Sequence, residues 1–190
     1  MSFTYNNIYT FRNFVDLNEH ESSEVLSGRN DVCVRAWMTS TEPISSDEHA
    51  QFMCRLKGND RSLYVRIDRA GCFVGVYSLN DITNSVGQGG FWVTPFARER
   101  FMALNVVFQG MDYMFRVHGI NTIYGFQNAN NHSAIRLNAL LGLRTETNDF
   151  SNSPDLIRIE MSRQHWYQKI RQDIKLITLM ERVEKLNGTN

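Results

Sequence analysis

A strand–helix–strand–helix succession in the middle of the chain constrains the fold more than any other feature of the sequence. Gly89–Thr94 is a short apolar run that Pro95 ends, and the pattern is helical from about Arg98 to His118. The predicted helix carries one apolar stripe, made of Phe101, Leu104, Val107, Phe108, Met111, Met114 and Phe115. Gly119 ends it. Strands and helices that follow one another in this way predict a mixed α/β domain.

The same succession continues to residue 142 and is completed by Leu156–Met161, the last predicted strand. Thr122–Phe126 predicts a short buried strand. Asn131–Leu141 predicts a further helix that Gly142 closes.

The first half of the chain predicts two helices between strands. A polar stretch, Asn18–Arg29, predicts a helix with Val25 and Leu26 turned inward, and Ser45 with Glu48 forms a capping box for a helix that ends near Leu56. The predicted strands are Ile8–Phe14, Ser62–Asp68 and Cys72–Asn80, and a polar link over residues 81–87 leads to the strand at Gly89.

The tail from Arg163 to Leu186 predicts one long amphipathic helix. Its apolar residues recur at spacings of three or four, namely Trp166, Ile170, Ile174, Ile177, Val183 and Leu186. We therefore divide the chain into a domain over residues 1–162 and a helical appendage over residues 163–190. The apolar face must be buried on the domain or on a partner subunit, so a homodimer through this helix is one of two possibilities.

Composition narrows the function classes. Twenty acidic residues balance twenty basic ones, which argues against a nucleic-acid binder, and the sequence has no apolar run of membrane-spanning length. The three cysteines show no CxxC spacing, which indicates reduced, buried thiols in a cytoplasmic protein. The histidines have no ligand-like spacing, so we expect no metal site.

The junction between the strand at Gly89–Thr94 and the following helix suits an anion. The first amides of a helix have no internal partners, and the helix dipole favours negative charge there. Arg98 and Arg100 add positive charge at the same place, which suits a pyrophosphate. The alternative is that both arginines are solvated surface residues.

Several ordered motifs resemble the GNAT superfamily of N-acetyltransferases. Arg98-Glu99-Arg100-Phe101-Met102-Ala103 stands where the family has Arg/Gln-x-x-Gly-x-Gly/Ala, and Asp112–Phe115 is similar to the family's helix ending. Ile120–Ile123 is similar to the next strand start. The second family signature corresponds to Asn131, Ala134, Leu137, Asn138, Gly142 and Leu143.

The resemblance implies a fold, an acyl donor and a set of donor-binding residues. The fold is a mixed, mostly antiparallel sheet that splays between its central strands, with helices on both faces. The donor is acetyl-CoA, transferred directly in a ternary complex and without a metal. The residues implied to bind it are Phe91, Val93, Arg98, Arg100, Phe101, Met102, Ala103 and Asn131.

Two departures from the family pattern concern the chemistry. Phe101 replaces a glycine that lets the backbone approach the pyrophosphate, so we expect its side chain to point away, into the core. Asn138 replaces a tyrosine that protonates the leaving thiolate, and it could donate a hydrogen bond to the sulfur instead. Gln88 stands near the family's glutamate base and cannot accept the proton. His49 is our substitute, as a base or as an acceptor contact, and the alternative is a surface histidine of the capped helix.

The acceptor side resembles the GNAT branch that acetylates nucleotide-linked amino-deoxy sugars in the pseudaminic-acid pathway. The resemblance rests on Arg29-Asn30, on the segment Asn80-Asp81-Ile82-Thr83 and on Trp92 before Pro95. It implies that Arg29 and Asn30 read the nucleotide and that Asn80 and Trp92 contact the acceptor. The alternatives are an exposed helix end for Arg29 and a core position for Trp92.

The glycine pair Gly89-Gly90 would permit a bulge whose amide stabilises the oxyanion, or it closes a turn. Two other functions stay open. They are a GNAT acting on a protein N-terminus or small amine, and a catalytically silent acyl-CoA-binding domain.

Overall fold

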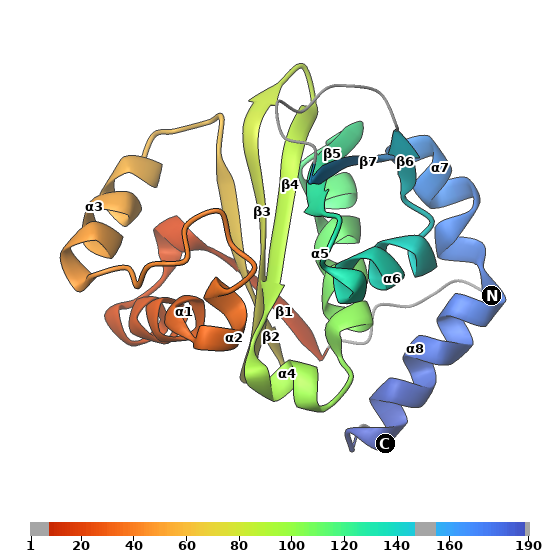
Figure 1. Ribbon diagram of the computed structural model, residues 1–190, viewed down its shortest axis with the longest axis horizontal. Helices are drawn as coiled ribbons and strands as arrows, with labels where there is room; N and C mark the ends of the chain where they lie inside the picture. Colours follow the sequence, from red (N-terminus) through yellow and green to blue (C-terminus); the bar gives the residue numbers. More distant parts are fainter. Residues whose placement is uncertain (1–7, 147–154, 189–190) are drawn as a thin grey trace.

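The computed structural model describes residues 8–146 and 155–188. Within them, seven strands form one sheet in the order β1-β2-β3-β4-β5-β7-β6 (Figure 1). The strands are β1 (Tyr9–Asn13), β2 (Leu63–Arg69), β3 (Cys72–Thr83), β4 (Val86–Val93), β5 (Thr122–Asn128), β6 (Arg144–Glu146) and β7 (Leu156–Ser162). The helices are α1 (Glu19–Asn30), α2 (Val32–Arg35), α3 (Ser46–Leu56), α4 (Pro95–Glu99), α5 (Ala103–Val117), α6 (His132–Leu140), α7 (Arg163–Gln168) and α8 (Ile174–Leu186), with two 3-10 turns, η1 (Phe14–Asp16) and η2 (Ile170–Gln172).

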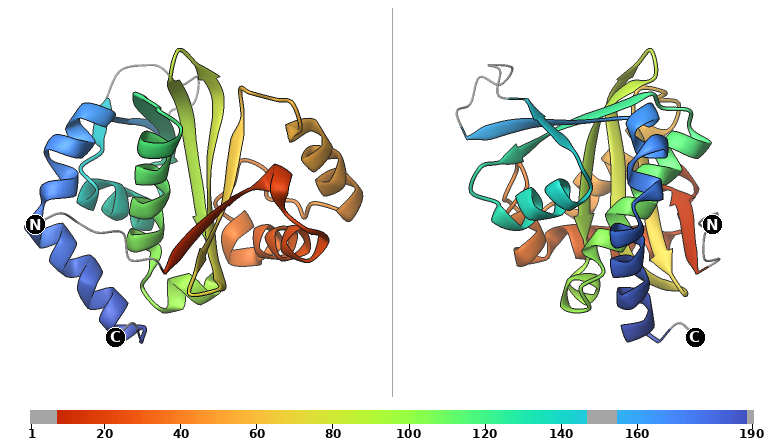
Figure 2. Two further views of the ribbon diagram at one scale, coloured as in Figure 1. Left: turned by 180° about the vertical axis from the view of Figure 1, so that it is seen from behind. Right: turned by 90° about the vertical axis from the view of Figure 1, so that its right-hand side faces the viewer.

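Every neighbouring pair of strands is antiparallel except β4 and β5, which are parallel. Helices lie on both faces of the sheet: α1, α2 and α3 on one side and α5, α7 and α8 on the other (Figure 2). The predicted mixed, mostly antiparallel α/β architecture is therefore confirmed.

The sheet splays between β4 and β5. The two strands pair over three positions, from Val86 opposite Thr122 to Gln88 opposite Tyr124, and beyond that point β5 continues to pair with β7. The strands come close where they part, because a side chain on Gly89 would lie 2.6 Å from Ile123 and one on Gly125 would lie 3.1 Å from the Gly89 carbonyl. The predicted opening between the central strands is thus present, and glycines form its apex.

The two faces of the sheet bury different residues. A bulge between β2 and β3 lets consecutive residues of β3 turn the same way, so that Val74 and Tyr77 pack in the core beside α5 whereas Val76 packs beside α1 and α3. The α5 side is a large hydrophobic cluster that extends from Tyr9 to Val183. On the other side, the buried cluster is Phe14, Val25, Leu56 and Val76, with further half-buried side chains around it.

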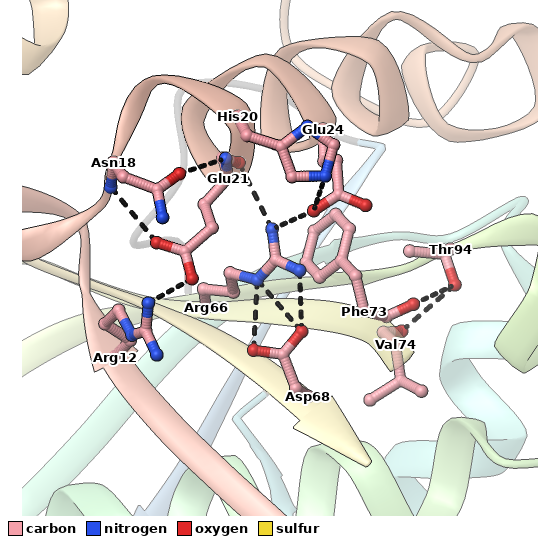
Figure 3. Close-up of polar contacts among 10 residues, drawn as sticks. All are labelled: Arg12, Asn18, His20, Glu21, Glu24, Arg66, Asp68, Phe73, Val74 and Thr94. Carbon is pink, nitrogen blue, oxygen red and sulfur yellow. Dashed lines mark hydrogen bonds and ion pairs between the residues drawn. The ribbon is translucent and has the colours of Figure 1, made fainter. Parts of the chain in front are cut away.

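A polar network adds to the smaller cluster. Arg66 of β2 is 4% exposed, and its guanidinium donates to Asp68 at 2.7–3.0 Å and to Glu24 of α1 at 2.8 Å (Figure 3). It also donates to the Glu21 carbonyl and lies 4.4 Å from the centre of the Phe73 ring. Because all these donors are satisfied, Arg66 joins α1 to the sheet without leaving a buried charge unpaired.

The helix starts on this side follow local rules. Ser45 and Glu48 form the predicted capping box of α3, and Asn18 forms a second one with Glu21 for α1 (Figure 3). Val25 is buried as expected, and Leu26 is half-buried.

The tail corrects one prediction. Residues 163–186 are not one helix, because η2 separates α7 from α8 and Asp173 caps α8 anew by accepting from the amides of Lys175 and Leu176. The new start changes the buried face, so that Leu176 and Met180 are buried whereas Ile174 is 77% and Leu186 82% exposed.

Trp166, Ile170, Leu176, Met180 and Val183 all belong to the large cluster beside α5. The tail thus packs on its own chain. The division at residue 162 and a further contact with a partner subunit stay predictions.

Other local predictions were wrong for identifiable reasons. The helix predicted over 98–118 is broken at residues 100–102, because the apolar stripe continues across a loop. The predicted polar link over 81–87 is mostly strand, closed by a two-residue turn at Asn84 and Ser85 with φ of +50° and +61°. The short elements α2 and β6 were not predicted. All three cysteines, Cys33, Cys54 and Cys72, are exposed and not buried. Across the described ranges, no helix combines the length and apolar character needed to span a membrane.

Candidate active site

The loop between α4 and α5 forms the first part of the candidate site. Thr94 caps α4 by accepting from the Ala97 amide at 3.2 Å, whereas α5 begins at Ala103 without a side-chain cap. The first amides of α5 are therefore available to an anion. Arg98 and Arg100 are exposed beside them, and Met102 is buried beneath the loop.

Phe101 lies in this loop in the left-handed region, with φ of +59°. A non-glycine residue pays about 1–2 kcal/mol for this conformation, which explains why glycine suits the position. The side chain is 78% exposed, so the expectation that it enters the core was wrong. Next to it, the Arg100 guanidinium lies 3.9 Å from the centre of the Phe96 ring. The end of α4 and the loop together thus present two aromatic rings and two arginines to solvent.

The second part is the edge of β4 that faces the splay. The Gly90 carbonyl accepts from Ser78 of β3, and the Trp92 carbonyl also faces β3, 2.7 Å from the position that a Gly75 side chain would take. The Gly89 carbonyl instead faces β5. Because backbone groups alternate along a strand, the amides of Phe91 and Val93 point toward the opening as well.

The predicted bulge at Gly89-Gly90 is absent from the pairing of these residues. They pair with Leu79 and Ser78 in unbroken register, so neither glycine is an extra residue in the β3–β4 ladder. The Phe91 ring itself stacks on Tyr77, 6.5 Å between ring centres.

The third part is α6, which covers β5. The Asn131 side chain accepts from the Ala134 amide at 3.0 Å and so caps the helix. Asn138 is 4% exposed and donates through Nδ2 to Oε1 of Gln127 at 2.7 Å, while its own Oδ1 is buried without a partner. An unsatisfied buried oxygen costs about 1–3 kcal/mol, so this amide fits a site that a ligand completes. Gln127 was not predicted, because no motif singles it out along the chain.

The fourth part is the face of β3 and β4 toward α1 and α3. Residues opposite one another in the ladder share a face, which places Asn80 beside Gln88 and Val76 beside Trp92. Tyr64 of β2 donates to Oδ1 of Asn80 at 2.9 Å. Burial raises the pKa of the Tyr64 phenol, so it remains a donor at neutral pH. Tyr64 was not predicted, because it looks like an ordinary strand residue.

Trp92 is half-buried at the end of this face nearest α4. Its ring meets Phe73 edge-on at 5.6 Å, and a side chain on Gly28 of α1 would lie 3.0 Å from it. The half-buried ring thus packs with the smaller cluster, and its contact with an acceptor stays a prediction.

His49, the predicted base, lies between α1 and α3. Its Nε2 is 2.9 Å from Oγ of Ser22, and its ring packs near Phe52. Burial lowers the pKa of His49, so it is neutral at pH 7. Because α3 and α6 lie on opposite sides of the β3–β4 hairpin (Figure 1), the structure does not bring His49 and Asn138 together.

Arg29 and Asn30 support the segment between α1 and α3. Arg29 donates to the Ser40 carbonyl at 3.1 Å. Asn30 exchanges two hydrogen bonds of 2.8 Å with the backbone of Ile44. Both side chains therefore have a structural role, and their contact with an acceptor stays a prediction. Among the described residues, no three His, Cys, Asp or Glu side chains gather as a metal site would require.

Comparison with known proteins matches residues 13–144 to the family model of the acetyltransferase (GNAT) domain. The N-acetyltransferase PseH of Campylobacter jejuni superimposes with a TM-score of 0.66 at 18% identity, over 82% of this chain and 98% of that one. Its acetyl-CoA complex gives 0.61 at 17% identity, over 81% and 98% of the two chains. Spermidine N-acetyltransferase of Vibrio cholerae, in complex with CoA and spermine, gives 0.72 at 17% identity, over 85% and 99%. At these identities the structures are similar in fold alone. No curated protein matches by sequence.

Proposed function

The chain belongs to the acetyltransferase (GNAT) domain family, and we propose that it acetylates the amino group of a nucleotide-linked amino-deoxy sugar. Acetyl-CoA is the acyl donor and no metal is involved. The observation that carries the acceptor class is the face of β3 and β4 beside the splay. It presents neutral hydrogen-bonding groups, Asn80 and Gln88, and the Trp92 ring lies further along β4 on the same face. Such a face suits the hydroxyl groups and flat apolar side of a sugar.

We assign the donor to the opening between β4 and β5. The pyrophosphate would meet the first amides of α5, from Ala103 on, with Arg98 and Arg100 beside it. Met102 precedes these amides, and its own amide is bonded to the Ala97 carbonyl. The Phe91 and Val93 amides would hold the pantetheine arm and the acetyl carbonyl, with Asn131 near the arm. This placement agrees with the missing helix cap and the unpaired Asn138 oxygen.

The transfer is direct. The acceptor nitrogen attacks the thioester carbonyl, so that a C–N bond forms, the C–S bond breaks and the nitrogen loses one proton. A neutral histidine can take that proton through a chain of water molecules, and we assign this role to His49 because burial lowers its pKa. Asn138 has a second Nδ2 hydrogen besides the one given to Gln127, which can stabilise the departing thiolate.

We assign nucleotide recognition to Arg29 and the stacking contact to Trp92. Asn30 would act through the backbone of Ile44, since its amide is already engaged there. The resemblance of the segment from Asn80 to Thr83 in β3 to the sugar-acetylating branch supports this assignment, and the fold shared with PseH is compatible with it.

Thiol release from acetyl-CoA tests the acceptor class. UDP-linked 4-amino sugars, a peptide with a free N-terminus and spermidine are compared at equal concentration. We expect turnover with the amino sugars, and Trp92→Ala to raise their KM by about tenfold while Trp92→Phe raises it by about twofold. Turnover with the peptide or spermidine alone would overturn the sugar assignment. Acetyl-CoA binding without turnover on any amine would instead identify a silent acyl-CoA-binding domain.

A polyamine acceptor is the second candidate, and one observation favours it. A surface hollow of about 420 Å³ adjoins Tyr64, and its lining includes the Asp60 carboxylate but neither lysine nor arginine. A cationic amine would suit this hollow better than a nucleotide diphosphate. The spermidine N-acetyltransferase has the same fold. If this is the acceptor site, Asp60→Asn raises the KM for spermidine and leaves the KM for amino sugars unchanged.

We also propose a cytoplasmic location, where acetyl-CoA and reduced cysteines coexist. We propose a homodimer contact at α8 as well, where Ile174 and Leu186 are exposed and could pack against a partner subunit. Light scattering on the protein and on Leu186→Glu checks it, since a dimer through this face would dissociate in the variant.

A further inference from the structure

The end of α8 contacts the loop that we assign to the pyrophosphate. Asn187, just after the helix, donates through Nδ2 to the Arg100 carbonyl at 3.1 Å and to the Val183 carbonyl at 2.8 Å. The Arg69 guanidinium in turn lies 3.4–3.5 Å from the Asn187 carbonyl. A residue near the C-terminus is thus fixed between β2 and the loop that connects α4 to α5.

Glu184, one turn earlier, connects α8 to the first turn of α5. Its carboxylate accepts from Nε of Arg69 at 2.8 Å, from Oη of Tyr9 at 2.5 Å and from Nδ2 of Asn105 at 2.6 Å. Asn105 also donates to the Met180 carbonyl at 3.1 Å. Glu184 and Asn105 are both buried, so these bonds are shielded from water. The same short stretch of α8 therefore contacts both the loop and the helix start that would bind the phosphates.

The backbone conformation of Phe101 explains why the loop needs the contact with Asn187. A bulky residue keeps a left-handed conformation only where its surroundings fix it, and here fixed groups flank it. The preceding carbonyl, of Arg100, accepts from Asn187. The following amide, of Met102, donates to the Ala97 carbonyl at 2.9 Å. In a loop with glycine at this position no such support is needed.

We propose that Asn187, held by Arg69, which the Glu184 carboxylate fixes in turn, is a positioning residue for acetyl-CoA. It keeps the Arg100–Met102 loop in the conformation that binds the pyrophosphate, and so compensates for Phe101 in the place of glycine. The proposal rests on the donor site assigned above. Glu184 and Asn187 lie outside positions 13–144, so the tail supplies a contact to the loop from beyond the matched family segment.

Calorimetric binding of acetyl-CoA tests the proposal. Asn187→Ala should raise the Kd by about three- to tenfold, the range that one hydrogen bond contributes. Leu186→Ala, an exposed neighbour on the same turn, is the matched control and should change it less than twofold. In the Phe101→Gly background the effect of Asn187→Ala should fall below twofold, because glycine adopts the loop conformation unaided. Equal effects in both backgrounds would overturn the compensation. In turnover assays the KM for acetyl-CoA should rise while kcat stays constant, which a general loss of folding would not produce.

Hydrogen exchange without ligand separates this proposal from the donor-site assignment. Asn187→Ala should speed exchange in a peptide that covers residues 98–103, while the peptide that covers 174–183 keeps its protection. Unchanged exchange in the loop would overturn the proposal even if acetyl-CoA binds there. The donor site is tested separately, by acetyl-CoA binding to Arg98→Ala and Arg100→Ala. If these variants bind normally, the donor-site assignment is wrong, even where Asn187→Ala speeds exchange in the loop.

Discussion

The helices on the two sides of the sheet are held to it by different interactions. On the side of α5, a large hydrophobic cluster includes the tail, and the buried carboxylates of Asp112 and Glu184 bond α5 to α7 and α8. On the side of α1 and α3, a small cluster is supplemented by Arg66 and by hydrogen bonds of Arg29 and Asn30 to loop carbonyls. The proposed donor site therefore adjoins rigid packing, and the proposed acceptor site adjoins a polar layer.

Removing Trp166 should have the largest effect, because it tests the packed side. The side chain is fully buried against Phe108 and Phe115, and its Nε1 donates to Asp112 at 2.6 Å. Trp166→Ala should lower the free energy of unfolding by about 3–5 kcal/mol in urea denaturation. Ile174→Ala, on the exposed face of the same tail, should cost less than about 0.5 kcal/mol. Similar losses in both variants would mean that the tail does not pack as described.

Arg66 tests the polar side. Arg66→Met leaves Asp68 and Glu24 without their cation and should cost about 2–4 kcal/mol of unfolding free energy. The double variant Arg66→Met/Asp68→Leu should recover part of this loss, since it removes the unpaired charge as well. The KM for the acceptor should rise in the single variant, and the Kd for acetyl-CoA should change less than twofold. A change in the Kd instead would erase the distinction between the two sides.

Most elements were predictable, because their signals are local. The capping box at Ser45 and Glu48 and the glycine stops at 119 and 142 each depend on a few neighbouring residues. The breaks were not predictable in this way, since the apolar stripe runs through Phe101, which is exposed in the structure, and the tail spacing runs through Asp173, which restarts the helix.

The functional contacts were harder still. Arg69 and Glu184 are 115 residues apart in sequence, and Tyr64 meets Asn80 across two strands. No pattern along the chain pairs such residues. The donor motifs were therefore found from the sequence, whereas the partners that position them were found only from the structure.

Phe101 offers a smaller and more specific test of the rigid side. Phe101→Gly removes about 1–2 kcal/mol of left-handed strain but adds chain entropy to the unfolded state, so the net gain in stability should stay below about 1 kcal/mol. The Kd for acetyl-CoA should fall by about fivefold, because the backbone can approach the pyrophosphate without a side chain. Phe101→Ala retains the strain and separates the two causes. A higher Kd in Phe101→Gly would show that the ring itself contacts the donor.

The smallest expected effect concerns pH on the polar side. Burial lowers the pKa of His49 below its ordinary 6.5, so the unfolded chain binds a proton more readily than the folded one. The folded state therefore keeps its full stability above pH 6.5, and this contribution of His49 is lost as the pH falls through the lower pKa of the folded protein. Burial acts on His118 in the same direction, so the wild type should lose stability through both residues. His49→Gln, which can still bond to Ser22, should lose less between pH 6.5 and 5 in thermal unfolding. His118→Gln should also lose less, so that the two variants separate the two contributions. If His49 is also the base, His49→Gln lowers kcat at saturating substrates and His118→Gln does not. An unchanged kcat with an altered pH profile would leave His49 as a packing residue of the α1–α3 layer and move proton removal to water.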